Sequence, residues 1–359
     1  MRPKHIKQII AQAIESPVDS VPIHEWGPPG IGKSAIPKQV AEEAKIGFID
    51  LRGPLLDPTD LRGIPTVFEN RARWLPPTFL PTDMFCLDCK MAVNNGGKCP
   101  VCGGTNFTDR GILFLDELTA APPLTQAGMY QLVLDRMIGE YHLPDGWYVL
   151  AAGNRIEDRA VTYRMPTPLA NRFVHIDFDV NMDDWIAWAT WEKVNPNIIS
   201  FIRFKPDLLF SFKPDSSEKA FPTPRSWYFA SKMIHAAPTK LLPETLEGTV
   251  GKGATAEFMA FLKVQTELPD IKTILQEGSN FVPKRMDLKY ALVAALATRA
   301  TGVKQYERML EYSSHLDTEF AVLLITMLVA KNEEDMAVAP SFEKWARRNS
   351  DVIITRKML

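Results

Sequence analysis

The sequence predicts an α/β core with a parallel sheet flanked by helices, followed by an all-α region. Three observations support this fold class. From Val21 to about Asp179, short apolar runs typical of strands alternate with helix-like segments, as in parallel sheets covered on both faces. A glycine-rich loop follows the first of these runs. Beyond about Asn181 the strand patterns stop, and helical periodicity with proline-rich connectors takes over.

The chain begins with a predicted amphipathic helix, whose apolar side chains run from Ile6 to Ile14 without the apolar core of a signal peptide. Strands and then helices are expected after it. Pro22 is compatible with a strand only near its start, and Pro37 falls early in a helix, where its missing N–H costs little. The expected strands are 21–26, 47–51, 112–115, 147–152 and 173–178, and the later helices are 185–193, 226–235, 254–263, 288–300 and 320–330.

Composition bounds the class of protein. The chain has 359 residues, of which 46% are hydrophobic and 23% charged, which is ordinary for a soluble globular protein of two or three domains. Its formal net charge of -2 gives no electrostatic footprint for nucleic acid. The longest apolar run, 320–330, is too short to span a bilayer and suits a buried helix. We therefore expect a cytoplasmic protein with no membrane segment.

The loop after the first expected strand has the spacing G-x-x-x-x-G-K-[ST] of a nucleoside triphosphate cradle. Its glycines let the backbone wrap so that successive N–H groups point at phosphate oxygens. Lys33 supplies a positive charge for the β- and γ-phosphates, and the Ser34 hydroxyl is a ligand for Mg²⁺. The predicted cofactors are therefore ATP or ADP and Mg²⁺. The predicted binding residues are Gly27, Pro28, Pro29, Gly30, Ile31, Gly32, Lys33 and Ser34.

Polar residues follow two further expected strands. Asp116 and Glu117 close the apolar run 112–115, at the strand end where α/β folds place their ligands. We expect Asp116 to hold Mg²⁺ beside the phosphate loop, and Glu117 to orient and deprotonate the attacking water. Asn154 follows the run 147–152, where its amide can hydrogen-bond the γ-phosphate or the water. Without the phosphate loop, these residues would read as a solvated strand end and a tight turn.

All four cysteines fall in one short segment. They form two C-x₂-C pairs with a nine-residue connector, and Gly96-Gly97 and Gly103-Gly104 supply tight turns. This spacing predicts a closed, structural Zn²⁺ site with four thiolate ligands. An iron–sulfur site or a redox dithiol pair is the alternative, since spacing alone does not exclude iron. The predicted ligands are Cys86, Cys89, Cys99 and Cys102.

The ordered set GPPGIGKS, ILFLDE, AAGN, LANRF and TPRSW resembles the AAA+ ATPases, specifically their MoxR-type branch, over about residues 20–265. The resemblance implies a homo-oligomeric ring, a hexamer, with ATP bound between subunits. It implies that Lys33 and Ser34 are Walker A residues and that Asp116 and Glu117 are Walker B residues.

The same resemblance assigns three further residues. Asn154 matches sensor 1, Arg172 matches the arginine finger that reaches a neighbour's γ-phosphate, and Arg225 matches sensor 2 in the lid. An arginine supplied across an interface makes hydrolysis conditional on assembly, and an arginine on a mobile lid can couple loss of the γ-phosphate to lid rotation. Arg159 and Arg164, in the preceding loop, are rivals of Arg172 for the finger.

The predicted domains are an α/β nucleotide-binding core over 1–180, a helical lid over 181–265 and a helical extension over 266–359. The core carries a hairpin insertion over 57–81, expected to turn at Glu69-Asn70, and a zinc-binding insertion over 84–106. MoxR-type ATPases carry a hairpin in this region that faces the pore of the ring, so we expect the hairpin and the zinc lobe to contact substrate or partner. A stapled loop that protects the surface is the alternative.

For residues outside these motifs the sequence supports less specific predictions. His24 and Glu25 depart from the usual apolar strand before the loop, and are read either as facing the nucleotide base or an interface, or as polar residues at a strand edge. Trp185, Trp188 and Trp191 recur at helical spacing, which favours core or subunit interface over a ligand site. The extension matches no motif, and its basic residues are expected on a solvated helix face: Arg347, Arg348, Arg356 and Lys357.

The resemblance implies an ATP-driven machine that remodels a protein partner. Relatives commonly work with a protein that carries a von Willebrand factor A domain, so a separate subunit of that kind is expected. A nucleic-acid-stimulated helicase or translocase is the first alternative, although the near-neutral charge does not favour it. A nucleotide switch with negligible turnover is the second, and Glu117 and Arg172 weigh against it.

Overall fold

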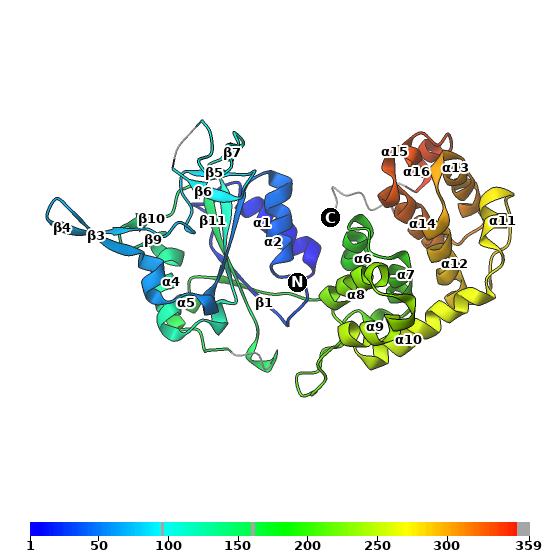
Figure 1. Ribbon diagram of the computed structural model, residues 1–359, viewed down its shortest axis with the longest axis horizontal. Coiled ribbons are helices and arrows are strands. Elements are labelled where there is room, and N and C mark those ends of the chain that lie inside the picture. The colour runs from blue at the N-terminus through cyan, green and yellow to red at the C-terminus, as the bar shows by residue number, and fades with distance from the viewer. Residues whose placement is uncertain (95–96, 159–161, 350–359) are drawn as a thin grey trace. The chain divides into compact units, whose positions relative to one another are not determined.

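The computed structural model describes residues 1–94, 97–158 and 162–349, which divide into two compact units (Figure 1). The first unit is Met1–Asp179, and the second begins at Val180. Among the described residues, no helix is long and apolar enough to cross a membrane.

The first unit is built on a five-stranded parallel sheet with the strand order β12-β1-β11-β8-β2. Its strands coincide with the five expected strands, and β8 and β11 are continuous apolar runs because they are buried on both faces of the sheet. The α/β core with a parallel sheet, followed by a helical region, is therefore confirmed. The strands are β1 (Ile23–Trp26), β2 (Gly47–Arg52), β8 (Gly111–Asp116), β11 (Trp147–Gly153) and β12 (Val174–Asp177).

Helices cover both faces of this sheet (Figure 1). On one face, Leu113 and Leu115 of β8 and Val149 of β11 pack in one core with Met129 and Leu132 of α4. On the other face, α2 contacts β2 and β8, and α1 packs on α2. The helices of this unit are α1 (Pro3–Ala13), α2 (Ala35–Ala44), α3 (Pro58–Arg62), α4 (Pro123–Asp135) and α5 (Thr167–Ala170).

A hairpin follows α3, as the sequence predicts. β3 (Ile64–Phe68) pairs antiparallel with β4 (Arg71–Leu75), and the turn falls at Glu69 and Asn70, whose φ angles of 49° and 59° suit a tight two-residue connection. Ile64 and Val67 are 73% and 80% exposed. The hairpin therefore presents apolar side chains to solvent, and in Figure 1 it projects away from the sheet.

The cysteine segment forms its own small sheet, in the order β6-β5-β7. Figure 1 places this lobe well apart from the tip of the β3–β4 hairpin, although both lie between β2 and β8 in the chain. A second short hairpin follows α4. These strands are β5 (Met84–Cys86), β6 (Met91–Val93), β7 (Phe107–Thr108), β9 (Met137–Ile138) and β10 (Tyr141–His142).

The second unit consists of helices around one continuous core, in which residues from Trp185 to Ala339 take part. The five expected helices are present, and α14, the longest apolar run, has most of its side chains buried. Its helices are α6 (Met182–Trp191), α7 (Pro196–Phe204), α8 (Pro224–Ala236), α9 (Leu242–Val250), α10 (Lys252–Val264), α11 (Ile271–Gln276), α12 (Met286–Arg299), α13 (Gly302–Ser313), α14 (Thr318–Lys331), α15 (Glu333–Ala337) and α16 (Phe342–Arg348).

The structure also bears on several predictions for single residues outside the main motifs. Trp185 is buried in the core of the second unit and Trp188 packs against that core, as their helical spacing favours. Arg347 and Arg348 are exposed on α16, as expected for a solvated face. Three predictions lie outside the described residues: the rival finger Arg159, the turn residue Gly96, and the basic residues Arg356 and Lys357.

One reading of the first strand is wrong. β1 lies between β12 and β11, so His24 and Glu25 are not polar residues at a strand edge. Both side chains are fully buried. The run looks polar because two ionisable residues occupy an internal strand, on opposite faces of the sheet.

Candidate functional site

The glycine-rich loop connects β1 to α2 at the carboxyl end of the sheet, where parallel α/β folds place their ligands. Gly30 and Gly32 have φ angles of 79° and 113°, which side chains with a Cβ rarely adopt. The loop therefore needs glycine at both positions to keep its curvature. Lys33 and Ser34 immediately precede the first turn of α2, a helix N-terminus that favours anions.

Lys33 and Asn154 are in direct contact. The Lys33 Nζ donates to Asn154 Oδ1 at 2.9 Å, and also to the carbonyl oxygens of Gly27 at 2.6 Å and Pro28 at 2.9 Å. Gly27 N donates to Gly153 O at 3.3 Å, which ties the loop to the end of β11. The structure thus brings together two residues that are 121 positions apart and that sequence reasoning assigned to one phosphate site.

Asp116 ends β8, the strand on the other side of β11. Burial raises the pKa of Asp116, the negative charge of Asp50 raises it further, and the charge of Lys33 opposes the shift. A partly desolvated carboxylate at this place, with the Ser34 hydroxyl on the loop, is a donor set that fits Mg²⁺.

Glu117 has an unusual backbone. Its φ and ψ angles are 53° and 36°, in the left-handed region, and its N–H donates to Asp116 Oδ1 at 2.9 Å. A residue other than glycine in this region costs about 1–3 kcal/mol, and such strain concentrates at functional sites. The Glu117 side chain is exposed rather than packed into the core.

The two buried residues of β1 lie behind the loop. The side-chain nitrogens of His24 and both carboxylate oxygens of Glu25 have no hydrogen-bond partner in the described part of the chain. Burial lowers the pKa of His24 to about 3 and raises the pKa of Glu25 well above its usual value. The charge of Lys33 acts on both groups, lowering the pKa of each. His24 is therefore neutral at pH 7, and burial shifts Glu25 toward its neutral form.

Arg172 lies elsewhere in the first unit. Its guanidinium carbon stands 3.9 Å from the centre of the Tyr130 ring on α4, and its Nη1 donates to Pro168 O. These contacts are with its own α4 and α5 rather than with the group formed by Lys33 and Asn154. Arg164, a rival for the finger, is exposed.

Arg225 belongs to the second unit. It lies in the first turn of α8 and is exposed. The turn is fixed by a capping box, in which Ser226 N donates to Thr223 Oγ1 at 3.0 Å and Thr223 N donates to Ser226 Oγ at 2.8 Å. The sequence T-P-R-S thus builds a rigid helix start that presents Arg225 to solvent.

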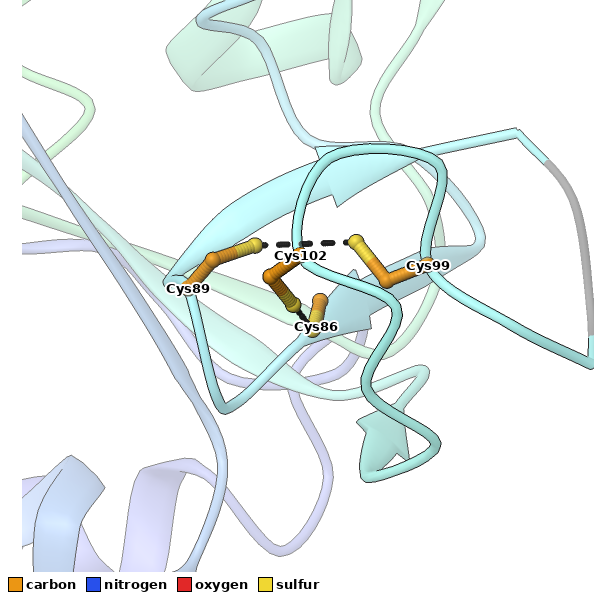
Figure 2. Close-up of side chains that lie close together, drawn as sticks. All are labelled: Cys86, Cys89, Cys99 and Cys102. Atoms are coloured by element: carbon orange, nitrogen blue, oxygen red, sulfur yellow. Dashed lines mark hydrogen bonds between the residues drawn. The ribbon is translucent and has the colours of Figure 1, made fainter.

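The four cysteine sulfurs converge on one point (Figure 2). All lie within 4.8 Å of one another, with 3.7 Å between Cys86 and Cys102 and 3.6 Å between Cys89 and Cys99. Tetrahedral coordination at a Zn–S distance of about 2.3 Å separates the sulfurs by about 3.8 Å. Disulfide bonds are far shorter, at about 2.05 Å. The sulfur geometry therefore fits one tetrahedral metal ion.

The two C-x₂-C pairs have matching backbones. Lys90 N donates to Cys86 O at 2.8 Å, and Gly103 N donates to Cys99 O at 2.8 Å. Lys90 and Gly103, each one residue after a pair, have φ angles of 59° and 74°. Two equivalent turns facing each other present four thiols to one centre, which a redox dithiol pair does not require.

The cysteine lobe is anchored on the sheet core. Phe85, the residue before Cys86, is buried and meets the ring of Trp147 edge-on, at 5.5 Å between centroids. Trp147 begins β11 and also packs closely on Gly47 and Gly111, the first residues of β2 and β8. The lobe therefore packs at the amino ends of these strands, opposite the edge that carries Lys33 and Asp116.

Two residues near the site were missed from sequence. Tyr130 is an aromatic residue inside an apolar helix, and nothing in the neighbouring sequence indicates that its ring packs against the Arg172 guanidinium. His175 alternates with apolar neighbours in β12, and that alternation was a signal that one face of the strand carries a polar group. Trp26 Nε1 donates to His175 Nδ1 at 2.8 Å, a contact between two strands that no local pattern encodes.

No protein-family model and no curated protein matches this chain. Among solved structures, a point mutant of RuvB from Thermotoga maritima is 16% identical, over 82% of this chain and 82% of that chain, with a TM-score of 0.39. The T. maritima RuvB described as a Holliday junction branch migration motor is 16% identical over 81% and 80%, with a TM-score of 0.35. NtrX from Brucella abortus in complex with ADP is 14% identical over 97% and 67%, with a TM-score of 0.39. At these TM-scores the likenesses carry no functional conclusion.

Proposed function

We propose that this chain is an AAA+ ATPase of the MoxR type that hydrolyses Mg·ATP. The observation that carries the proposal is the contact between Lys33 and Asn154 at the carboxyl edge of the sheet, with Asp116 on the next strand. A phosphate loop, an acidic strand end and a polar amide there are the parts that phosphoryl transfer needs, since it depends on positioning and charge stabilisation.

Each residue has a distinct role in this proposal. The backbone N–H groups of the loop and Lys33 bind the phosphates, and Ser34 and Asp116 hold Mg²⁺. Glu117 orients the attacking water and accepts its proton. Asn154 releases Lys33 to the phosphates and hydrogen-bonds the γ-phosphate or the water.

We further propose that the active form is a ring, a hexamer, in which Arg172 acts on the nucleotide of the neighbouring subunit. The support within the chain is that the described contacts of Arg172 are with Tyr130 and Pro168, away from its own phosphate loop. Arg225 acts as the nucleotide sensor of a lid over 181–265, and 266–359 is an extension of that lid. The four cysteines hold a structural Zn²⁺.

The proposed partner is a protein, of the kind that carries a von Willebrand factor A domain. The exposed apolar side chains of the hairpin, Ile64, Val67 and Phe68, support a contact with another protein rather than a purely protective role. The anchoring of the cysteine lobe through Phe85 supports a structural role for the metal, and separates the lobe from the hairpin as a contact surface.

ATP turnover tests the core of the proposal. Wild-type protein should release phosphate from Mg·ATP over many turnovers. Lys33→Ala should abolish binding of a fluorescent ATP analogue, whereas Glu117→Gln should bind it normally and hydrolyse at least about 10²-fold more slowly, the usual contribution of a general base. Binding without turnover in the wild type would overturn the ATPase and leave a nucleotide switch. Hydrolysis stimulated by DNA, in a salt-sensitive manner, would replace the protein partner with nucleic acid.

A further inference from the structure

His175 connects the strand before the phosphate loop to the turn that carries Arg172. Trp26 Nε1 donates to His175 Nδ1 at 2.8 Å, and His175 Nε2 lies 2.8 Å from Ala170 O. Because Nδ1 accepts, it carries no proton, so the ring proton is on Nε2 and is donated to the Ala170 carbonyl. One neutral tautomer of His175 therefore satisfies both partners at once.

The two ends of this bridge adjoin the proposed catalytic elements. Trp26 is the last residue of β1 and is followed by Gly27 of the phosphate loop. Ala170 is the last residue of α5, and Arg172, two residues later, closes the turn by donating its N–H to Leu169 O at 3.1 Å. The bridge holds the backbone from which the Arg172 side chain projects.

Buried rings hold the bridge in place from the core side. His24 packs on Trp26 with 4.2 Å between ring centroids, and on Phe173 with 5.5 Å. Phe173 lies between the turn and His175 in the chain and is itself buried. The end of β1, the turn and the start of β12 thus form one packed group.

We propose that His175 is a positioning residue for Arg172: its neutral imidazole fixes the 170–172 turn against Trp26, and thereby sets where the guanidinium reaches on a neighbouring subunit. This inference rests on the proposed function, because it needs Arg172 to act in a neighbour. Tyr130 and Pro168 hold the guanidinium within the single chain. Among the described contacts of His175 none is with the guanidinium; His175 fixes the 170–172 backbone, on which the position of the Arg172 side chain depends.

A subunit-mixing experiment tests this role. Glu117→Gln subunits cannot hydrolyse ATP but still offer Arg172, and Arg172→Ala subunits can hydrolyse only with a neighbour's arginine. Mixing the two should therefore restore ATP hydrolysis. Replacing the first partner by Glu117→Gln/His175→Phe should lower the restored rate at least about tenfold, since an arginine finger contributes about 10³–10⁵.

Two variants control for the shape and chemistry of the side chain. Glu117→Gln/His175→Gln should restore most of the rate, because the amide offers one acceptor and one donor as the neutral imidazole does. Glu117→Gln/Val174→Thr, a change at an exposed neighbour on the same strand, should restore the full rate. Equal rates with His175→Phe and Val174→Thr would overturn the proposal.

The reciprocal mixture separates positioning from simple damage. Subunits carrying Arg172→Ala/His175→Phe keep their own Glu117, and should hydrolyse ATP normally when Glu117→Gln subunits supply the arginine. Loss of the rate in this mixture too would show that His175 supports its own nucleotide site or the fold, and would overturn the proposal. If Glu117→Gln does not rescue Arg172→Ala at all, the ring with shared sites fails instead.

Discussion

Lys33 is held by three oxygen acceptors, two of which are carbonyls of its own loop. The ammonium group is therefore held against the loop, and Asn154 contributes an acceptor from outside the loop. In the proposed function, a phosphate that binds Lys33 would displace these bonds, and the amide of Asn154 would then become available. This exchange joins nucleotide binding to the end of β11.

Substitution of Asn154 tests that exchange. We expect Asn154→Ala to lower kcat for ATP by about 10²–10³, the cost of losing one transition-state hydrogen bond. The Kd for ATP should change little, because the loop and Lys33 remain. Steady-state hydrolysis with a separate binding titration measures both. An unchanged kcat, or a loss of binding equal to the loss of rate, would contradict the role of Asn154.

The buried side chains of β1 link stability to pH. Because the pKa of His24 is lowered to about 3, the folded protein keeps it neutral while the unfolded chain binds a proton below about 6.5. Stability is then lost as pH falls from about 6.5 toward 3, by about 1.4 kcal/mol per pH unit at most. Glu25 acts in the opposite sense: its pKa is raised, so its contribution falls as pH rises above about 4.5.

We expect His24→Phe to flatten the acid side of the stability profile. The ring keeps the packing on Trp26 and Phe173 but cannot take up a proton. Urea unfolding of wild type and variant at several pH values between 7 and 4 measures the effect, because the two proteins differ only at residue 24. Parallel stability curves over this range would show that His24 does not carry the acid sensitivity.

At the scale of elements, the cysteine lobe has little core of its own. Cys86 and Cys99 are buried mainly with Val93, and the lobe joins the main core through Phe85. We therefore expect the proposed metal ion to stabilise a segment that its own apolar contacts cannot. Because Phe85 lies against Trp147, order in the lobe extends to the amino ends of β2, β8 and β11.

Removal of the metal should destabilise the first unit. We expect about one zinc ion per chain by elemental analysis, and its loss in Cys86→Ser with a fall in Tm of about 10 °C, since structural zinc contributes several kcal/mol to folding. The matched control is Val101→Ser, an exposed residue within the second pair. Bound iron, detected by elemental analysis together with visible absorbance, would show that the site holds iron instead of zinc. Full stability of Cys86→Ser would contradict a structural metal.

The sequence predicted some elements well, for physical reasons. Buried parallel strands such as β8 and β11 are continuous apolar runs, and Glu69-Asn70 is a turn that pairs its own flanks, so both can be read locally. The helix α7 was missed because its crowded apolar residues, from Ile198 to Ile202, hide the period of a helix between prolines. Helices of five to seven residues, such as α15 and α16, carry too short a pattern to be read.

The site shows the same division. Motif spacing predicts functional roles for Lys33, Asp116 and the four cysteines, because a phosphate loop and a thiolate site need fixed residue types close together in the chain; these roles stay predictions, while the structure brings the four sulfurs together. The strand-edge reading of His24 and Glu25 failed because local polarity does not report which strand is internal. Trp26–His175 and Arg172–Tyr130 are tertiary contacts, and only the fold brings their members together.

At the scale of the whole molecule, we expect ATP hydrolysis to be a property of an assembly. The phosphate loop and Arg172 are in the same compact unit, yet the described contacts of Arg172 are with Tyr130 and Pro168. A single subunit would then hold nucleotide with an incomplete transition-state site. In the proposed assembly, Arg172 of a neighbouring subunit would supply the missing positive charge, so we expect the specific activity to rise with protein concentration.

Sedimentation velocity of Glu117→Gln, with and without Mg·ATP, tests whether the site is shared between subunits. We predict a hexamer-sized species with Mg·ATP, and the same species in Arg172→Ala, whose hydrolysis should fall by about 10³-fold or more. A protein that binds ATP and stays monomeric at all concentrations would contradict the shared site, and the chain would then be a nucleotide switch.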